Sequence, residues 1–329
     1  MNSVELGTTG LKAPQIGFGC SALLGRSGRK ESLLALNAAW DEGIRFFDTA
    51  RSYGYGESEA LLGEFLRGRR DQAVIATKFG ILASSQPTWK RIAKSAARTV
   101  LKLVPSAHKT LQKAAAGQFA HHQFTLPVLK QSIEQSLAKL KVDTIDMLFL
   151  HAAPASVLEQ EDLLDAMARL VEQGKIRVAG LSADPPVVEL ALERNPRQLG
   201  AMQFPCNVFE ISAATNFSAR SAGTHALVAN HPFGGVARVQ QTRAVLKTLS
   251  ENPSLDQALR AKLTSGEDSL LADVVLNTIL RDTGIHIVIP AMMKLEHIRL
   301  NVRAVSNSRF SSAEIAQIRH ALATSQPAL

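Results

Sequence analysis

The feature that most constrains the fold of this chain is an alternation of short apolar runs with helical patterns. Eight runs are apolar and rich in β-branched residues or Phe, which is typical of buried strands. These runs occupy residues 15–20, 44–49, 73–79, 146–151, 175–181, 201–205, 224–229 and 285–290. Helical patterns occupy residues 32–42, 57–67, 127–141, 161–173, 185–193 and 268–282. Strands that alternate with helices indicate βαβ units and a parallel sheet.

Glycine marks the entry to many of these strands. A glycine stands at or next to the start of five runs, namely Gly43, Gly174, Gly200, Gly223 and Gly284. Glycine readily adopts the left-handed conformation that ends a helix before a turn into a strand. Eight strands punctuated in this way favour a (β/α)₈ TIM barrel. A doubly wound sheet is the alternative, but Gly17-Phe18-Gly19 lacks the third glycine of the G-x-G-x-x-G motif that would support it.

The length and composition fit a single barrel domain over residues 1–329. A β-hairpin near residues 4–11 is predicted to close the bottom of the barrel, and a C-terminal helix and tail are predicted over residues 305–329. The two cysteines of the chain cannot build a disulfide framework, which favours a reducing, cytoplasmic location. No stretch of about 18 apolar residues occurs, so no membrane span is predicted.

The basic excess of the chain is confined to one segment. No acidic residue occurs between Asp71 and Glu134, whereas nine lysines and arginines do. The other residues carry 28 basic and 29 acidic side chains, so the net charge of +8 arises in this segment. This distribution argues against a nucleic-acid partner, for which a broadly basic surface is typical.

The basic segment contains a predicted helical insertion after the third strand, over residues 81–124. Residues 89–104 have helical spacing, with Trp89 on an apolar face and Arg91 and Lys94 on a basic face. A solvated surface helix over the barrel mouth is one interpretation. A lid that attracts anionic substrates or cofactor phosphates, with Trp89 as a substrate contact, is the second. The third is a basic amphipathic helix that rests on an anionic membrane.

Ionisable residues stand where neighbouring predicted strands end. Asp48 ends the second strand and is followed by Tyr53, Lys78 lies near the end of the third, and His151 ends the fourth. The carboxyl ends of barrel strands meet at one rim, so these four side chains are predicted to lie together. The alternative for each residue alone is an ordinary polar side chain that leaves the core at a strand end.

Together these four side chains suit acid catalysis. A Lys ammonium beside a Tyr hydroxyl favours the phenolate and lowers its pKa from about 10. The Asp would hold the Lys, and the His would hydrogen-bond the phenol or a substrate carbonyl. Such a group can pass a proton to a carbonyl oxygen as hydride reaches the carbon. None of the four residues supplies hydride, so a cofactor is required.

The residues around this group carry a resemblance to a known family. The stretch Phe46-Phe47-Asp48-Thr49-Ala50-Arg51-Ser52-Tyr53-Gly54-Tyr55-Gly56-Glu57-Ser58-Glu59, followed by Leu62-Gly63, resembles the aldo-keto reductase superfamily. The resemblance implies a (β/α)₈ barrel that reduces aldehydes and ketones with a nicotinamide cofactor. It implies that Tyr53 is the general acid and that Lys78 lowers its pKa. It also implies that Asp48 supports Lys78 and that His151 orients the carbonyl.

The same resemblance implies a set of cofactor contacts. Ser182 and Gln203 match the residues that hold the nicotinamide carboxamide, and Gly19-Cys20-Ser21 matches a loop near the nicotinamide. Pro232-Phe233-Gly234-Gly235 resembles the pyrophosphate loop, and Asn301 matches an adenine contact. Asp48, Lys294 and His297 complete the predicted set.

After the eighth strand the chain departs from the family pattern. The family often has Lys or Gly, then Ser, and later Arg, to hold the 2′-phosphate of NADPH, where this chain has Ala291, Met292 and His297. A phosphate is best held by Arg or Lys at close range, and Lys294 and Arg299 stand nearby. We therefore predict NADP(H), with NAD(H) as a serious alternative.

Two functions fit these observations. The first is a nicotinamide-dependent oxidoreductase that interconverts a small aldehyde or ketone, with sugar-derived carbonyls among the candidates, and the alcohol. The second is a non-enzymatic nucleotide-binding scaffold or sensor with the same fold. The pairing of Tyr53 with Lys78 favours the enzyme, because a sensor has no need of a proton donor. No metal site is predicted, since the histidines match no ligand spacing, and a monomer or small homo-oligomer is expected.

Overall fold

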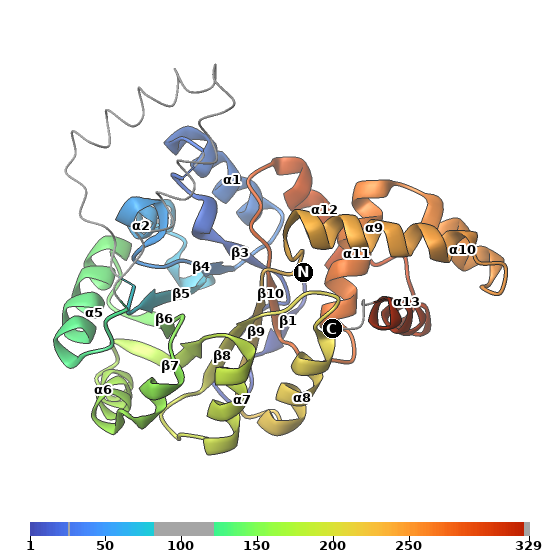
Figure 1. Cartoon of the computed structure of the whole chain (residues 1–329). Coiled ribbons are helices and arrows are strands. Elements are labelled where there is room, and N and C mark those ends of the chain that lie inside the picture. The colour runs from blue at the N-terminus through green and yellow to red at the C-terminus, as the bar shows by residue number, and fades with distance from the viewer. Residues whose placement is uncertain (26, 82–121, 326–329) are drawn as a thin grey trace, which may run out of the picture.

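In the computed structural model, which describes residues 1–25, 27–81 and 122–325, the eight predicted strands form a closed parallel barrel (Figure 1). The strands are β3 (Gly17–Gly19), β4 (Phe46–Asp48), β5 (Val74–Phe79), β6 (Ile145–His151), β7 (Ile176–Ser182), β8 (Ala201–Pro205), β9 (Ala226–Asn230) and β10 (Ile287–Ile289). They pair in chain order from β3 to β10. Backbone hydrogen bonds from Val288 to Gln15 (2.9 Å) and from Gly19 to Pro290 (3.2 Å) join the last strand to the first. The predicted (β/α)₈ barrel is confirmed.

Helices surround the barrel on its outer side (Figure 1). The six predicted helices are α1 (Arg29–Asp41), α2 (Ser58–Phe65), α5 (Leu126–Leu140), α6 (Glu161–Glu172), α7 (Pro185–Arg194) and α11 (Glu267–Leu280). Among the described residues, five further helices are α8 (Ile211–Ser221), α9 (Gly235–Glu251), α10 (Gln257–Thr264), α12 (Leu295–Ser306) and α13 (Ser312–Thr324). The last of these lies within the predicted C-terminal helix and tail.

The glycines predicted before the strands are left-handed at four of five positions, although helix α11 has already ended at Leu280 before Gly284. Left-handed φ angles occur at Gly43 (+91°), Gly174 (+70°), Gly223 (+77°) and Gly284 (+71°). The prediction is wrong for Gly200, because helix α7 ends five residues earlier, where Asn195 takes the left-handed position with φ +46°. Asn tolerates that conformation better than other non-glycine residues. Gly200 instead lies close to the side chain of Val178 on β7.

The predicted N-terminal hairpin closes the lower end of the barrel. Strands β1 (Ser3–Glu5) and β2 (Lys12–Pro14) pair antiparallel. The turn between them lies against the start of β9, where Thr8 N donates to Thr224 O (3.0 Å). Apolar residues of the hairpin pack into the barrel interior with Phe46 and Val228. The opposite rim, where the strands end, is therefore the end left for a site.

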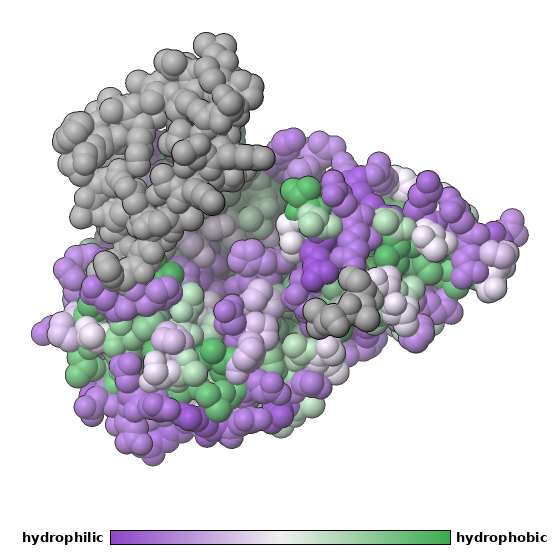
Figure 2. Space-filling model, viewed as in Figure 1, coloured by the Kyte–Doolittle hydropathy of each residue, from purple (hydrophilic) through white to green (hydrophobic). Residues whose placement is uncertain are grey.

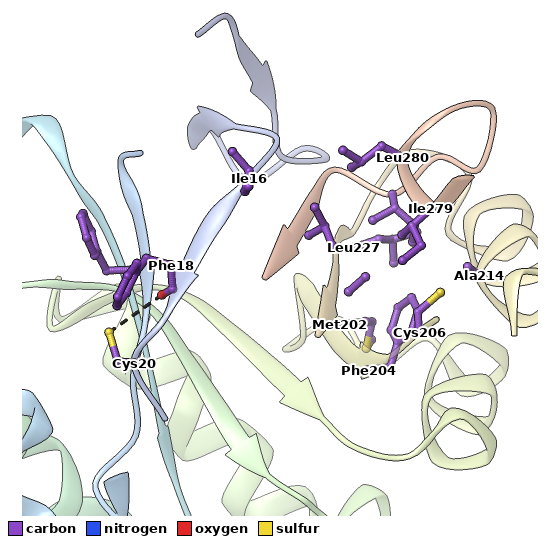
Figure 3. Packing of buried hydrophobic residues seen from close by; sticks show 14 of the residues in the cluster. Ile16, Phe18, Cys20, Met202, Phe204, Cys206, Ala214, Leu227, Ile279 and Leu280 are labelled. Atoms are coloured by element: carbon purple, nitrogen blue, oxygen red, sulfur yellow. Dashed lines mark hydrogen bonds between the residues drawn. The ribbon is translucent and has the colours of Figure 1, made fainter. Parts of the chain in front are cut away.

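The two faces of each strand serve different cores. Leu227 on β9 lies beside Ile279 of α11 outside the barrel (Figure 3), and Phe204 on β8 packs against α8 there. The alternate residues Ala226 and Val228 point into the barrel interior. Successive side chains of a strand point to opposite faces. Because both faces are buried here, the strand runs are apolar throughout.

Two long connections leave the upper rim. The one after β9 forms α9 and α10, which pack with α13 beside the barrel, and their outer surface is mostly hydrophilic (Figure 2). The other spans the predicted insertion, whose ends meet: Gln123 N donates to Gly80 O (2.8 Å), and Ile81 pairs with His122. Residues 82–121, including the predicted helix at 89–104 and Trp89, lie outside the described residues. In the part of the chain that is described, no helix is long and apolar enough to cross a membrane.

Candidate active site

A buried ion pair lies at the centre of the upper rim. Lys78 on β5 donates to both carboxylate oxygens of Asp48 on β4, each at 2.7 Å, and to the backbone oxygen of Thr49 at 2.9 Å. The two side chains are almost completely buried, with residue exposures of 1% for Lys78 and 4% for Asp48. Burial is the largest effect and alone would lower the pKa of Lys78, but the charge of Asp48, the charge of Tyr53 and the hydrogen bond to Asp48 together outweigh it, so the net shift is upward. Lys78 is therefore a fixed positive charge at the rim.

Tyr53 lies over this positive charge. The Lys78 ammonium nitrogen is 5.1 Å from the centre of the Tyr53 ring. Lys78 acts on the phenol as predicted and lowers its pKa, but burial is the larger effect, so the pKa of Tyr53 lies above its ordinary value. Tyr53 is therefore a neutral phenol at neutral pH, which is the form that can donate a proton.

His151 completes the group at the end of β6. Its ring meets the ring of Tyr53 edge-on, with centroids 5.8 Å apart and an interplanar angle of 82°. Burial, followed by the charges of Lys78 and His122, lowers the pKa of His151 to about 3. The imidazole is therefore neutral, and its buried Nδ1 has no hydrogen-bond partner among the described residues. A neutral imidazole can orient a carbonyl oxygen but is not a proton reservoir at neutral pH.

A row of hydrogen-bonded polar side chains extends from the ion pair across the barrel. Gln203 Nε2 on β8 donates to Asp48 Oδ1 (2.8 Å), and Ser182 Oγ on β7 donates to Gln203 Oε1 (2.8 Å). Strand register sets this row, because His151 lies opposite Ser182 and Ser182 opposite Gln203. The resemblance predicted Gln203 as a cofactor contact, but its hydrogen bond to Asp48 was not predicted. An inward-facing amide in an apolar strand was the available signal.

The predicted loop after β3 lies beside the ion pair. Gly19 pairs with Asp48 in the strand register. Cys20 is buried, its thiol is directed at Phe18 O (3.9 Å, Figure 3), and its pKa is raised by burial and by the charge of Asp48. Ser21 is exposed. Both cysteines of the chain are free and buried, and a raised thiol pKa means an unreactive group.

The predicted pyrophosphate loop leads into the first turn of α9. Pro232 is buried and Phe233 half-buried, while Gly234 and Gly235 are left-handed, with φ angles of +62° and +83°. Helix α9 has no side-chain cap and no acidic residue in its first turn. The free amide groups and the dipole of such a helix end fit an anionic group such as a pyrophosphate.

The remaining predicted contacts lie on α12. Lys294 and His297 are exposed at the start of this helix, which also lacks a side-chain cap. Asn301 is buried and donates to Met292 Sδ (3.4 Å). Arg299 is bonded to Glu42 of the neighbouring helix α1 (3.0 Å), so it already has an acidic partner. Lys294 is thus the better placed of the two bases for a phosphate.

The donor set fits a nicotinamide dinucleotide. Gln203 keeps a second amide hydrogen and Ser182 keeps acceptor capacity after their mutual bond. The uncapped first turn of α9 favours an anion, whereas α12 is also uncapped but carries Glu296 in its first turn, which opposes one. Within the described residues, no group of three His, Cys, Asp or Glu side chains is placed to hold a metal ion.

Comparison with known proteins agrees with this geometry. The family model described as the aldo/keto reductase family matches residues 15–323. The chain belongs to the aldo/keto reductase family. Its similarity to solved structures shows the same barrel: it superposes on an aldo-keto reductase of Bacillus halodurans in its holo form with a TM-score of 0.71 and 21% identity, covering 98% of this chain and 96% of that one.

Curated aldo/keto reductase relatives are matched over part of their length. Aldo-keto reductase YhdN of Bacillus subtilis is 28% identical over 216 residues, which cover 64% of this chain and 55% of the relative. D-threo-aldose 1-dehydrogenase of a Pseudomonas species is 31% identical over 209 residues, which cover 60% of this chain and 58% of the relative. The matches thus span little more than half the length of these two relatives.

Arg51 is the residue near the site that the sequence analysis left without a role. It stands two positions before Tyr53, is buried, and donates to Ser132 and Gln135 of α5. A charged residue directly after a buried strand was a visible signal, but its partners lie more than 80 positions away and could not be read from the sequence.

Removing one member of the ion pair is expected to lower the free energy of unfolding more than removing both. Lys78→Met leaves the Asp48 carboxylate buried without its cation, so the free energy of unfolding should fall by about 3–5 kcal/mol. The Lys78→Met/Asp48→Asn variant should recover part of this loss. Urea denaturation of both variants measures the difference.

The exposed pair Lys12–Glu5, with side-chain exposures of 66% and 60%, provides the matched control. Lys12→Met should change the free energy of unfolding by less than about 1 kcal/mol. An equally small effect of Lys78→Met would contradict the assignment of a tightly coupled buried pair.

Proposed function

We propose that this aldo/keto reductase family chain is an NAD(P)H-dependent oxidoreductase that interconverts an aldehyde or ketone and the corresponding alcohol. The observation that carries the proposal is the cluster at the upper rim. A neutral phenol on Tyr53 lies over a buried cation and edge-on to a neutral imidazole. A binding module has no use for a proton donor held in this way, which makes the non-enzymatic scaffold the weaker candidate.

In this proposal the chain moves one proton and stabilises one oxygen. A bound nicotinamide cofactor supplies or accepts the hydride, which no side chain can do. Tyr53 donates its hydroxyl proton to the carbonyl oxygen, and Lys78 stabilises the phenolate that remains. His151 hydrogen-bonds the same oxygen and fixes its direction. Asp48 keeps Lys78 in place through the two bonds at 2.7 Å.

The cofactor is proposed to lie along the upper rim from β7 to α12. Ser182 and Gln203 would hold the nicotinamide amide, and the first turn of α9 would hold the pyrophosphate. Gly19, Cys20 and Asp48 border the nicotinamide position in this assignment. Asn301 would lie near the adenine. We propose NADP(H), with Lys294 as the contact to the 2′-phosphate.

Sugar-derived carbonyls are the proposed substrate class. The support is the similarity to D-threo-aldose 1-dehydrogenase of a Pseudomonas species, 31% identical over 209 residues.

Replacing Tyr53 by Phe is expected to remove catalysis and spare binding. Loss of a general acid costs roughly 10²–10⁴-fold in rate, while no cofactor contact is assigned to the hydroxyl. The kcat for 4-nitrobenzaldehyde and for D-aldoses would be measured with the dissociation constants of NADPH and NADH, from quenching of Trp fluorescence. Tyr55→Phe, which changes the other tyrosine of the chain, is the control and should stay active.

Turnover in Tyr53→Phe equal to that of the unchanged chain would contradict the assignment of Tyr53. Binding of neither dinucleotide to the unchanged chain would favour the scaffold over the enzyme.

The cofactor preference is expected to depend on Lys294 and not on Arg299. A Lys–phosphate contact is a charge-assisted bond, so Lys294→Met should weaken the binding of NADPH by roughly tenfold or more and leave the binding of NADH unchanged. Arg299→Met should alter neither, because Arg299 is paired with Glu42. Fluorescence titrations with both dinucleotides measure this. Tighter binding of NADH than of NADPH by the unchanged chain would overturn the NADP(H) assignment.

A further inference from the structure

The loop that carries Tyr53 has an unusual backbone. Gly54, Tyr55 and Gly56 are consecutive left-handed residues, with φ angles of +57°, +59° and +86°. This conformation costs a non-glycine residue such as Tyr55 about 1–2 kcal/mol. Such a backbone persists when its surroundings hold it in place. The loop therefore needs external support if Tyr53 is to keep its orientation.

Helix α5 supplies support on both sides of Tyr53. Two residues before it, the Arg51 guanidinium donates to Ser132 Oγ and Gln135 Oε1. Three residues after it, Gly56 O accepts from Lys139 Nζ at 2.6 Å. All three partners lie on one helix, Leu126–Leu140. The loop is thus fastened to α5 at two points that flank the phenol.

The chemistry of Arg51 suits a rigid connection. Its planar guanidinium makes its two bonds from different nitrogens, Nη1 and Nη2, to residues three positions apart on α5. A Lys at this place could offer only a flexible point charge. The electrostatic influences on the Tyr53 phenol come from Lys78, Asp48 and Cys20. Arg51 therefore acts on Tyr53 through its position.

We propose that Arg51 is a positioning residue for the general acid: it fastens the Tyr53 loop to α5 and keeps the phenol ring edge-on to His151. The proposal rests on the proposed function, since it assumes that Tyr53 donates the proton. Lys139, through its bond to Gly56 O, is the second and weaker fastening of the loop to α5.

The kinetic test compares Arg51→Met, Arg51→Lys and Lys139→Met with the unchanged chain. A misplacement of about 1 Å can cost a reaction up to 10²-fold, so Arg51→Met should lower kcat for 4-nitrobenzaldehyde by at least about tenfold. Its dissociation constant for NADPH should stay within about twofold. Arg51→Lys should recover part of the loss, and Lys139→Met should lower kcat less than Arg51→Met does.

Arg45 is the matched control. It flanks the same strand at the opposite end, where it donates to Trp40 O (2.7 Å) and Ile44 O (2.9 Å). Arg45→Met removes an arginine with two such bonds from the lower end of the barrel. It should reduce stability in urea, as Arg51→Met does, and leave kcat unchanged. An equal fall of kcat in both variants would overturn the proposal, because a general loss of stability would then explain it.

A spectroscopic test needs neither substrate nor cofactor. The chain has only two tyrosines, so Tyr55→Phe leaves Tyr53 as the sole phenol. At pH 10 a solvent-exposed tyrosine is about half ionised, whereas Tyr53, which is half-buried and whose pKa is raised above its ordinary value, should show little phenolate absorbance at 295 nm. Adding Arg51→Met should let more water reach the ring and raise that absorbance toward the half-ionised value, and adding Arg45→Met should not.

Unchanged kcat and unchanged phenolate absorbance in Arg51→Met would each overturn the proposal. Failure of the proposed function would look different. The unchanged chain would then lack turnover, or Tyr53→Phe would retain it, and the absorbance test would still report whether Arg51 positions the ring.

Discussion

The buried pair of Lys78 and Asp48 is the interaction on which the rest of the site depends. Its two charges are tolerable in a barrel core because the ammonium bonds both carboxylate oxygens and Thr49 O. The barrel makes this possible by placing β4 beside β5 with both strands ending at the same rim. Gln203 then uses a free lone pair of Asp48, which ties β8 into the same network.

The protonation states at the rim follow from a competition between burial and that one cation. Burial favours the neutral forms of Tyr53 and His151. For His151 the charge of Lys78 acts in the same direction, whereas for Tyr53 it acts against burial and does not prevail. The result is one charged and two neutral groups around a position that a carbonyl oxygen could take. A proton donor and an orienting group are thus both available without a change of pH.

Much of the fold could be predicted from the sequence because each strand is buried on both faces and reads as a plain apolar run. Asp48, Lys78 and His151 were predictable as neighbours because strand ends meet at a barrel rim. Helix α9, with several polar residues and little buried surface, carries no such pattern. The raised pKa of Tyr53 depends on how deeply the ring is covered, and the partners of Arg51 depend on the packing of α5. Neither the pKa of Tyr53 nor the partners of Arg51 can be predicted from the neighbouring residues in the sequence.

Proton donation from Tyr53 depends on the buried charge of Lys78, which stabilises the ionised form of the phenol. Its most direct test is the phenolate absorbance of Tyr53 as a function of pH, in a Tyr55→Phe background, with and without the Lys78→Met/Asp48→Asn replacement. The pair is removed together so that no single charge is left buried. Tyr53 is expected to ionise at higher pH once the pair is gone, because Lys78 acts on the phenol more strongly than Asp48 does. Ionisation at the same or lower pH would contradict it.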